Sequence, residues 1–127
     1  MDERLQRLID REEIRDLVNR FSAYEDRRMW DDAAECFTED GVFDETAVDG
    51  PLSMGREQIR AFFKEQVGPA MAFLAHYATG HVITEQSADE AKGFFNCFFE
   101  GGLHDGTIVK VHGYLDEVKT VDAQLRE

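Results

Sequence analysis

The chain is poor in proline, cysteine and basic residues, and it has no long apolar run. Its 127 residues include two prolines and two cysteines, and 27 acidic side chains against 14 basic ones give a net charge of -13. A surface with this much negative charge repels phosphate backbones and anionic lipids. We therefore expect neither nucleic acid nor a membrane as a partner. No stretch approaches the ~20 apolar residues that span a bilayer, and the amino terminus does not resemble a signal peptide. A cytoplasmic location is therefore expected.

Motifs for metal or cofactor chemistry are also missing from the sequence. Cys36 and Cys97 are far apart and fit no metal-binding or redox spacing,. The four histidines contain no His-x-x-x-His pair, so we predict no metal site. Neither a glycine-rich phosphate loop nor a Gly-x-Ser-x-Gly elbow occurs. Cofactor-free chemistry, or none, is what remains.

Helical periodicity dominates the first half of the chain. Apolar residues recur at three-and-four spacing over 14–24 and over 30–37, which predicts two amphipathic helices joined by the charged segment 26–28,. An earlier stripe at Leu5, Leu8 and Ile9 lies on nearly the opposite side, and Asp10 with Glu13 resembles a capping box. These features predict a break near Asp10.

The rest of the chain reads as a third helix and several strands. The helix is predicted from Arg56 to a stop at Gly68-Pro69, because proline cannot continue the helical hydrogen bonds. Strands are predicted at 42–48, 74–85, 91–100 and 107–118, the last three joined by short turns and therefore antiparallel. The expected fold is one α+β domain over 1–127, a curved sheet with helices packed across one face.

Strand alternation assigns residues to the two faces of that sheet. It places His76, Ala78, Gly80 and Val82 on one face and His81 on the other, toward solvent or a subunit contact,. Phenylalanines occur on both faces of the strand 94–99, although a one-sided sheet would keep one face polar. We therefore expect a homodimer or homotrimer formed through the sheet.

His76 is the candidate general base, because the unperturbed pKa of histidine lies near neutrality. The alternative is a buried histidine with one satisfied hydrogen bond. Asp26 could orient it and stabilise its protonated form, or could be a solvated carboxylate paired with Arg27 or Arg28. Helical phase points Asp26 away from the apolar stripe, so only a kink or helix end there could turn it inward.

Six segments of the sequence form a recognisable set: Ile14-Arg15-Asp16-Leu17, 24–31, 36–43, Gly55-Arg56-Glu57-Gln58-Ile59, 76–83 and Gly113-Tyr114-Leu115-Asp116-Glu117. Together they resemble the SnoaL-like group of the nuclear transport factor 2 (NTF2-like) superfamily. The resemblance implies a cone-shaped α+β barrel in which three N-terminal helices and a strongly bent, mostly antiparallel sheet enclose an apolar cavity. Relative to that family, the chain stops where a final strand would begin, so most of that strand is expected to be missing.

The branch that contains scytalone dehydratase, bile acid 7α-dehydratase and hexachlorocyclohexane dehydrochlorinase pairs an aspartate with a histidine at the positions of Asp26 and His76. The resemblance thus implies a cofactor-independent lyase or isomerase for a small hydrophobic ring-containing molecule, as in polyketide or steroid metabolism. A tyrosine of these dehydratases is Phe21 here, and Tyr24 could substitute as a catalytic group. The side chains expected to line the cavity are Phe21, Trp30, Phe37, Phe43, Phe62, Asn96, Phe98, His112 and Tyr114.

The alternative is a non-catalytic member of the superfamily that binds a hydrophobic ligand or mediates oligomerisation, since fold alone does not give function. A His76 within hydrogen-bond reach of Asp26 favours the enzyme. A His76 bonded to a backbone carbonyl, with Asp26 in water, favours the alternative.

Overall fold

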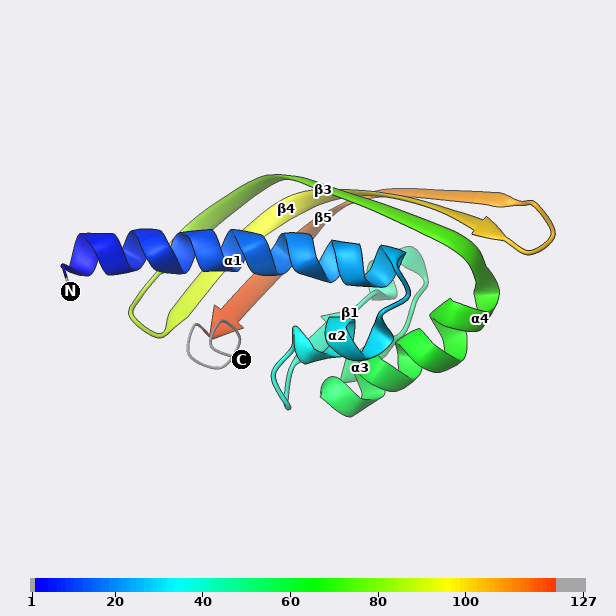
Figure 1. The fold of residues 1–127 in the computed structure, drawn as a ribbon, viewed down its shortest axis with the longest axis horizontal. Helices are drawn as coiled ribbons and strands as arrows, with labels where there is room; N and C mark the ends of the chain where they lie inside the picture. Colours follow the sequence, from blue (N-terminus) through cyan, green and yellow to red (C-terminus); the bar gives the residue numbers. More distant parts are fainter. Residues whose placement is uncertain (1, 121–127) are drawn as a thin grey trace.

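The protein is a layer of helices on one face of an antiparallel sheet, as predicted (Figure 1). The computed structural model describes the backbone of residues 2–120 and the side chains as far as Val111. The predicted loss of a final strand concerns residues 121–127, which lie outside the described residues. In chain order the elements are α1 (Glu3–Asp26), α2 (Trp30–Glu35), β1 (Val42–Asp44), η1 (Thr46–Val48), β2 (Leu52–Met54), α3 (Arg56–Phe62), η2 (Phe63–Val67), α4 (Gly68–Ala70), β3 (Met71–Gln86), β4 (Glu90–Leu103) and β5 (Ile108–Thr120).

The main sheet is the predicted three-stranded meander, in the order β3-β4-β5 and antiparallel throughout. Its long strands bend over α1 (Figure 1). In β3 the register shifts between Thr79 and Val82, and Gly80 takes a φ of 65°, a conformation that favours glycine,. This bulge changes which residues of β3 face the helices.

The bulge makes the predicted strand alternation wrong beyond Gly80. His81 contacts the ring of the buried Phe95 edge-on at 6.0 Å between centroids, and Ile83 packs against Ile14 of α1. His81 therefore shares the helix-facing side with His76 and does not face away from it. The reason is that one extra residue in a strand reverses the sidedness of all those after it.

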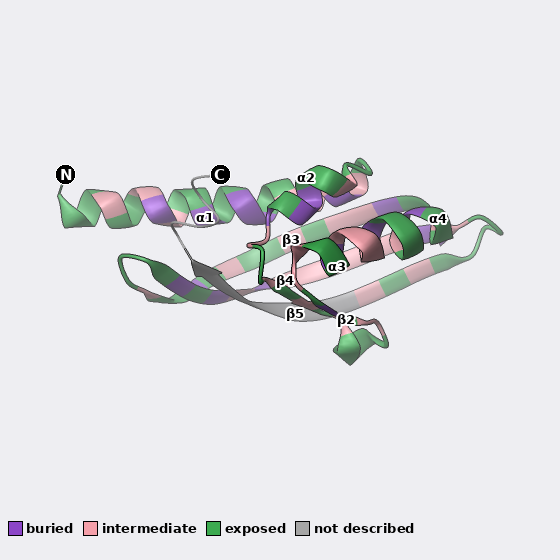
Figure 2. Cartoon of the chain, turned by 90° about the horizontal axis from the view of Figure 1, so that it is seen from below, coloured by how far each residue is buried: buried purple, intermediate pink, exposed green. Residues whose placement is uncertain are grey.

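The helix α1 runs without a break through Asp10, so the predicted restart is wrong (Figure 2). Asp10 is buried, and its carboxylate accepts a hydrogen bond from the Gln6 side chain at 2.9 Å instead of capping a new helix. Leu5 and Leu8 remain exposed, so the first stripe does not compete with the second for the sheet. Among the helices described, none is long and apolar enough to cross a membrane.

Two other predicted boundaries differ from the structure. The strand from Val42 ends at Asp44, whose carboxylate accepts hydrogen bonds from the backbone N–H and the hydroxyl of Thr46 and so starts the turn η1,. The hairpin partner β2 was not predicted. The third helix continues through η2 into α4 and ends at Ala70, with Pro69 in the first turn of α4 instead of at the end of the helix.

An aromatic cluster forms the core between α1, α2 and α3. Its centre is Ala33, Ile59 and Phe63, each fully buried. Around this centre pack Phe21, Tyr24, Trp30, Phe37, Phe43, Phe62 and Val67. Edge-on ring pairs, such as Phe21 with Phe37 at 5.4 Å between centroids, fix how the helices meet,.

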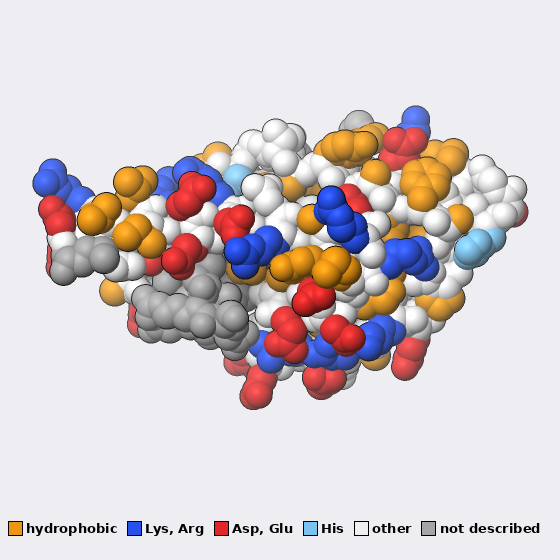
Figure 3. Space-filling view, viewed as in Figure 1, with side chains coloured by type: hydrophobic (Ala, Val, Ile, Leu, Met, Phe, Trp, Pro, Cys, Tyr) orange, Lys and Arg blue, Asp and Glu red, His pale blue; other side chains and the backbone are white. Residues whose placement is uncertain are grey.

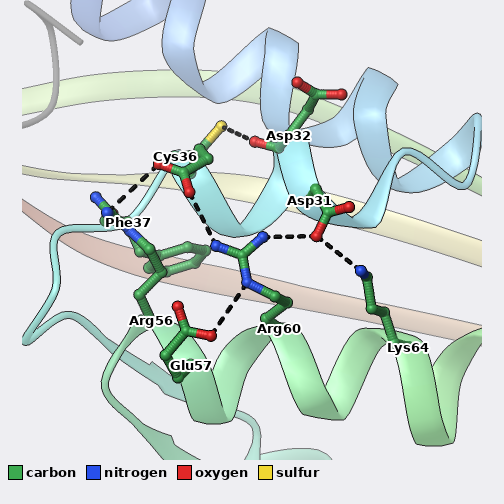
Figure 4. Close-up of polar contacts among 9 residues, drawn as sticks. Asp31, Asp32, Cys36, Phe37, Arg56, Glu57, Arg60 and Lys64 are labelled. Carbon is green, nitrogen blue, oxygen red and sulfur yellow. Dashed lines mark hydrogen bonds and ion pairs between the residues drawn. The ribbon is translucent and has the colours of Figure 1, made fainter.

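Ion pairs join α2 to α3 at the surface (Figure 4). The Arg60 guanidinium contacts Asp31 at 2.7 Å and Glu35 at 2.9 Å, and Lys64 contacts the same Asp31 oxygen at 2.8 Å. Arg56 Nε donates to the carbonyl of Phe37 at 2.7 Å. Acidic and basic side chains accordingly lie side by side along the lower edge of the molecule (Figure 3). This network holds the short helix α2 in place beneath the end of α1.

Candidate active site

The site begins with the turn that ends α1. Arg28 has a φ of 61°, and the backbone N–H of Met29 donates to the carbonyl of Tyr24 at 2.8 Å. The Arg28 guanidinium donates to the carbonyls of Gly68 and Met71, the latter at 2.9 Å, and lies 5.5 Å from the centroid of the Trp30 ring. The turn is thus fastened to the start of β3. Asp26 is the last residue of α1. The helix end that would allow its side chain to turn inward is therefore present.

His76 and Asp26 are held together by three hydrogen bonds. Nδ1 of the imidazole lies 2.6 Å from Asp26 Oδ1, and the backbone N–H of His76 donates to both carboxylate oxygens at 3.0 Å. A carboxylate bound to both the backbone and the ring of one residue has little freedom to rotate. It can therefore keep the Nδ1–H tautomer in place and offset positive charge on the ring.

Glu25 lies on the other side of the imidazole and was missed by the sequence analysis. Its Oε2 is 3.1 Å from His76 Nε2, and the residue is only 5% exposed. Burial raises the pKa of the Glu25 carboxyl well above its usual range, and the nearby charges of Glu45 and Asp26 raise it further,. The sequence signal that could have identified Glu25 is its position next to Asp26, because consecutive residues at a helix end can flank one side chain.

Two more groups complete the polar surroundings. Glu45, from the turn after β1, is partly buried, and burial raises its pKa. Cys97 lies opposite Ala78 on the helix-facing side of β4, and burial, then the charge of Glu25, raises the pKa of its thiol. The ring of Phe99 packs on His76 at 4.8 Å between centroids. Among the side chains described, no three His, Cys, Asp or Glu are arranged to hold a metal ion.

A groove of about 490 Å³ opens beside this site, between the last turns of α1 and the strand β3. His76 and Asp26 lie in its wall. The other lining residues are Asn19, Ser22, Ala23, Arg27, Tyr77, Ala78 and Thr79. The groove offers a path from solvent to the imidazole.

The structure separates the remaining predicted site residues whose side chains it describes from this groove. Tyr24 and the predicted cavity residues Phe21, Trp30, Phe37, Phe43 and Phe62 all pack in the aromatic core cluster. Asn96 and Phe98 lie on the opposite face of the sheet, where Phe98 contacts the exposed Tyr77 ring at 5.8 Å between centroids. The side chains of His112 and Tyr114 lie outside the described residues. Of the predicted residues that the structure describes, it brings together only Asp26 and His76.

The fold and the site thus define a class of protein: a small α+β domain with a histidine–carboxylate pair at the end of its first helix. The family model described as the SnoaL-like domain matches residues 6–126. The chain therefore belongs to the SnoaL-like domain family, and the resemblance found in the sequence is confirmed. Among curated proteins, none shows significant sequence similarity to it.

Solved structures agree with this assignment. A proposed aromatic ring hydroxylase from Novosphingobium aromaticivorans is 30% identical, with a TM-score of 0.84 over 89% of this chain and 79% of that one. Hexachlorocyclohexane dehydrochlorinase LinA type 3 from Novosphingobium barchaimii is 20% identical, with a TM-score of 0.82 over 93% and 80%. A proposed scytalone dehydratase from N. aromaticivorans is 17% identical, with a TM-score of 0.81 over 94% and 79%. The last two likenesses show a shared fold.

Proposed function

We propose that the protein is a cofactor-independent lyase or isomerase in which His76 removes a proton from carbon, while Asp26 orients the imidazole and offsets the positive charge that it gains. The substrate is a small hydrophobic ring-containing molecule. The observation that carries this proposal is the 2.6 Å contact between His76 Nδ1 and Asp26 Oδ1, reinforced by the two backbone hydrogen bonds to the same carboxylate. It meets the geometric requirement for a base and its orienting group.

The reaction follows from the positions of the two ring nitrogens. Nδ1–H donates to Asp26, so Nε2 carries the lone pair that accepts the proton. As the C–H bond breaks, the imidazole becomes an imidazolium whose charge the Asp26 carboxylate offsets. The electron pair left on carbon then forms a double bond and expels a leaving group, or shifts within the ring in an isomerisation. Structural neighbours named for dehydration and dehydrochlorination support an elimination.

The test is an NMR titration of His76 in the wild type and in Asp26→Asn. Loss of the carboxylate removes the group that stabilises the imidazolium, so the pKa of His76 should fall clearly. The matched control is Asp16→Asn, which removes an exposed carboxylate of the same helix that pairs with Arg20. A His76 pKa that is the same in Asp26→Asn and in the control would refute the coupling and favour a ligand-binding role.

A second role, self-association, is favoured by the outer face of the main sheet. This face carries large apolar side chains that are 44–57% exposed: Phe73, Tyr77, Val82 and Ile108. An apolar sheet face in water is typical of a subunit contact. We propose a homodimer or homotrimer formed through this face, on the side opposite the His76 site.

A further inference from the structure

Glu25 occupies the place from which His76 would have to take a proton. Asp26 uses Nδ1, so Nε2 is the only ring nitrogen left for a substrate. Glu25 Oε2 lies 3.1 Å from Nε2. A substrate C–H that reaches this lone pair must therefore displace Glu25 or lie against it. Any molecule that His76 deprotonates must touch the Glu25 carboxyl.

The surroundings of Glu25 favour its protonated form. The residue is 5% exposed, and among the described side chains the groups that face it are the carboxylates of Asp26 and Glu45, the imidazole of His76 and the thiol of Cys97. None of these is a fixed positive charge that would hold a second buried carboxylate beside Asp26. A protonated Glu25 donates its O–H to Nε2, and the imidazole stays neutral with its Nδ1–H on Asp26. At rest the three groups therefore share one negative charge.

We propose that Glu25 is the general acid of the reaction, which protonates an oxygen leaving group while His76 acts as the base. This inference rests on the proposed function. When a substrate takes Nε2, the buried Glu25 O–H loses its acceptor, and a buried donor left unpaired is unfavourable. A leaving oxygen on the carbon next to the one that loses the proton lies within reach and supplies a new acceptor. Phe21 has no acidic group and cannot replace the tyrosine that the related dehydratases have at its position. The Glu25 carboxyl supplies the acid instead.

The step balances within the site. The C–H bond breaks and its proton goes to Nε2, while the electron pair forms the carbon–carbon double bond. The C–O bond breaks, and the oxygen leaves as water with the proton from Glu25. The site is then left with imidazolium and a Glu25 carboxylate. Once the product leaves, the proton returns from Nε2 to Oε2 across their direct contact, and the resting state is restored.

The first test needs no substrate. The side-chain carboxyl carbon of Glu25 is followed by NMR against pH in the wild type and in Glu45→Gln. We expect the pKa of Glu25 in the wild type to lie well above the ordinary range of a glutamate, and to fall in Glu45→Gln because a neighbouring negative charge is lost,. A wild-type Glu25 that titrates near the ordinary value of about 4.3 would overturn the proposal, because a carboxylate has no proton to give.

The second test compares leaving groups. The probes are a cyclic ketone with a β-hydroxyl group and its β-chloro analogue, because chloride leaves without a proton. Glu25→Gln keeps a hydrogen-bond donor beside Nε2 but cannot transfer a proton. It should lower kcat for the hydroxyl probe about 10²–10⁴-fold more than for the chloro probe, the usual worth of an acid catalyst. Equal losses for the two probes would contradict an acid role.

His76→Ala distinguishes the two proposals. If it loses turnover of both probes while Glu25→Gln affects them equally, His76 is the base and the role of Glu25 is wrong. If His76→Ala retains turnover, or the wild type converts neither probe, the proposed function fails, and the titration of Glu25 still decides whether this carboxyl holds a proton at pH 7.

Discussion

Replacing Glu25 by glutamine should change how the stability of the protein depends on pH. In the unfolded chain a glutamate ionises near pH 4.3, whereas the folded protein holds the Glu25 proton to higher pH because of burial and the charges of Glu45 and Asp26,. Between these two pKa values the folded state binds one proton more than the unfolded state. The Glu25 contribution to the free energy of unfolding is therefore fully present below the unfolded pKa and declines as pH rises toward the folded pKa.

The size of the effect follows from this difference of one proton. Each pH unit within the window removes about 1.4 kcal/mol from the wild type, while glutamine, which cannot ionise, is unaffected. The free energy of unfolding of Glu25→Gln relative to the wild type should thus rise with that slope above about pH 4.5 and level off beyond the folded pKa. Urea denaturation followed by circular dichroism at several pH values measures it.

The control for this experiment is Glu13→Gln, which neutralises an exposed carboxylate of the same helix. Its stability should run nearly parallel to that of the wild type across the same pH range. Parallel curves for Glu25→Gln would refute the reasoning, since they would mean that Glu25 ionises at the same pH in the folded and unfolded states.

Two further predictions concern the core and the sheet surface. Phe63→Ala should lower the free energy of unfolding by about 3–5 kcal/mol in urea denaturation, because Phe63 is fully buried in the aromatic cluster,. The control Phe73→Ala, at a residue that is 45% exposed, should lower it clearly less. Equal losses for the two variants would mean that the core does not lie at Phe63. Tyr77→Lys should shift the protein toward monomer in sedimentation velocity, because it puts a charge on the outer sheet face,. The control is Leu8→Lys, at an exposed residue of α1. The same sedimentation for both variants would count against assembly through this face.

The elements with strong periodicity could be predicted from the sequence, and the deviations have local physical causes. The stripe from Ile14 and the three long strands are present because alternation and three-and-four spacing reflect burial directly,. The break at Asp10 is absent because a side-chain hydrogen bond from Gln6 satisfies the buried carboxylate within one continuous helix. Such a bond depends on which face is covered, and that is decided by residues far along the chain.

The pairing of Asp26 with His76 was predicted from family resemblance and from the condition that the helix end there. Helical phase alone argued against it, because phase describes a helix that continues. What ends α1 is a left-handed residue, Arg28, whose guanidinium binds two carbonyls beyond α3. Non-glycine residues rarely take that conformation, so a local pattern gives no warning of it. The site residue that phase disfavoured is therefore fixed by a long-range contact.

The same turn also brings a second carboxyl, that of Glu25, to the imidazole of His76. Consecutive helical residues point about 100° apart, so they seldom bind one partner. An imidazole that lies against the end of a helix can bind both residues, because its two nitrogens point in different directions and each can contact one carboxyl. Asp26 takes Nδ1 at 2.6 Å and Glu25 takes Nε2 at 3.1 Å. Their environments differ, since the Asp26 side chain lines the groove and is partly exposed, whereas the Glu25 side chain is almost fully buried. Two carboxyls held in different environments are what a base with an orienting group and a separate acid require.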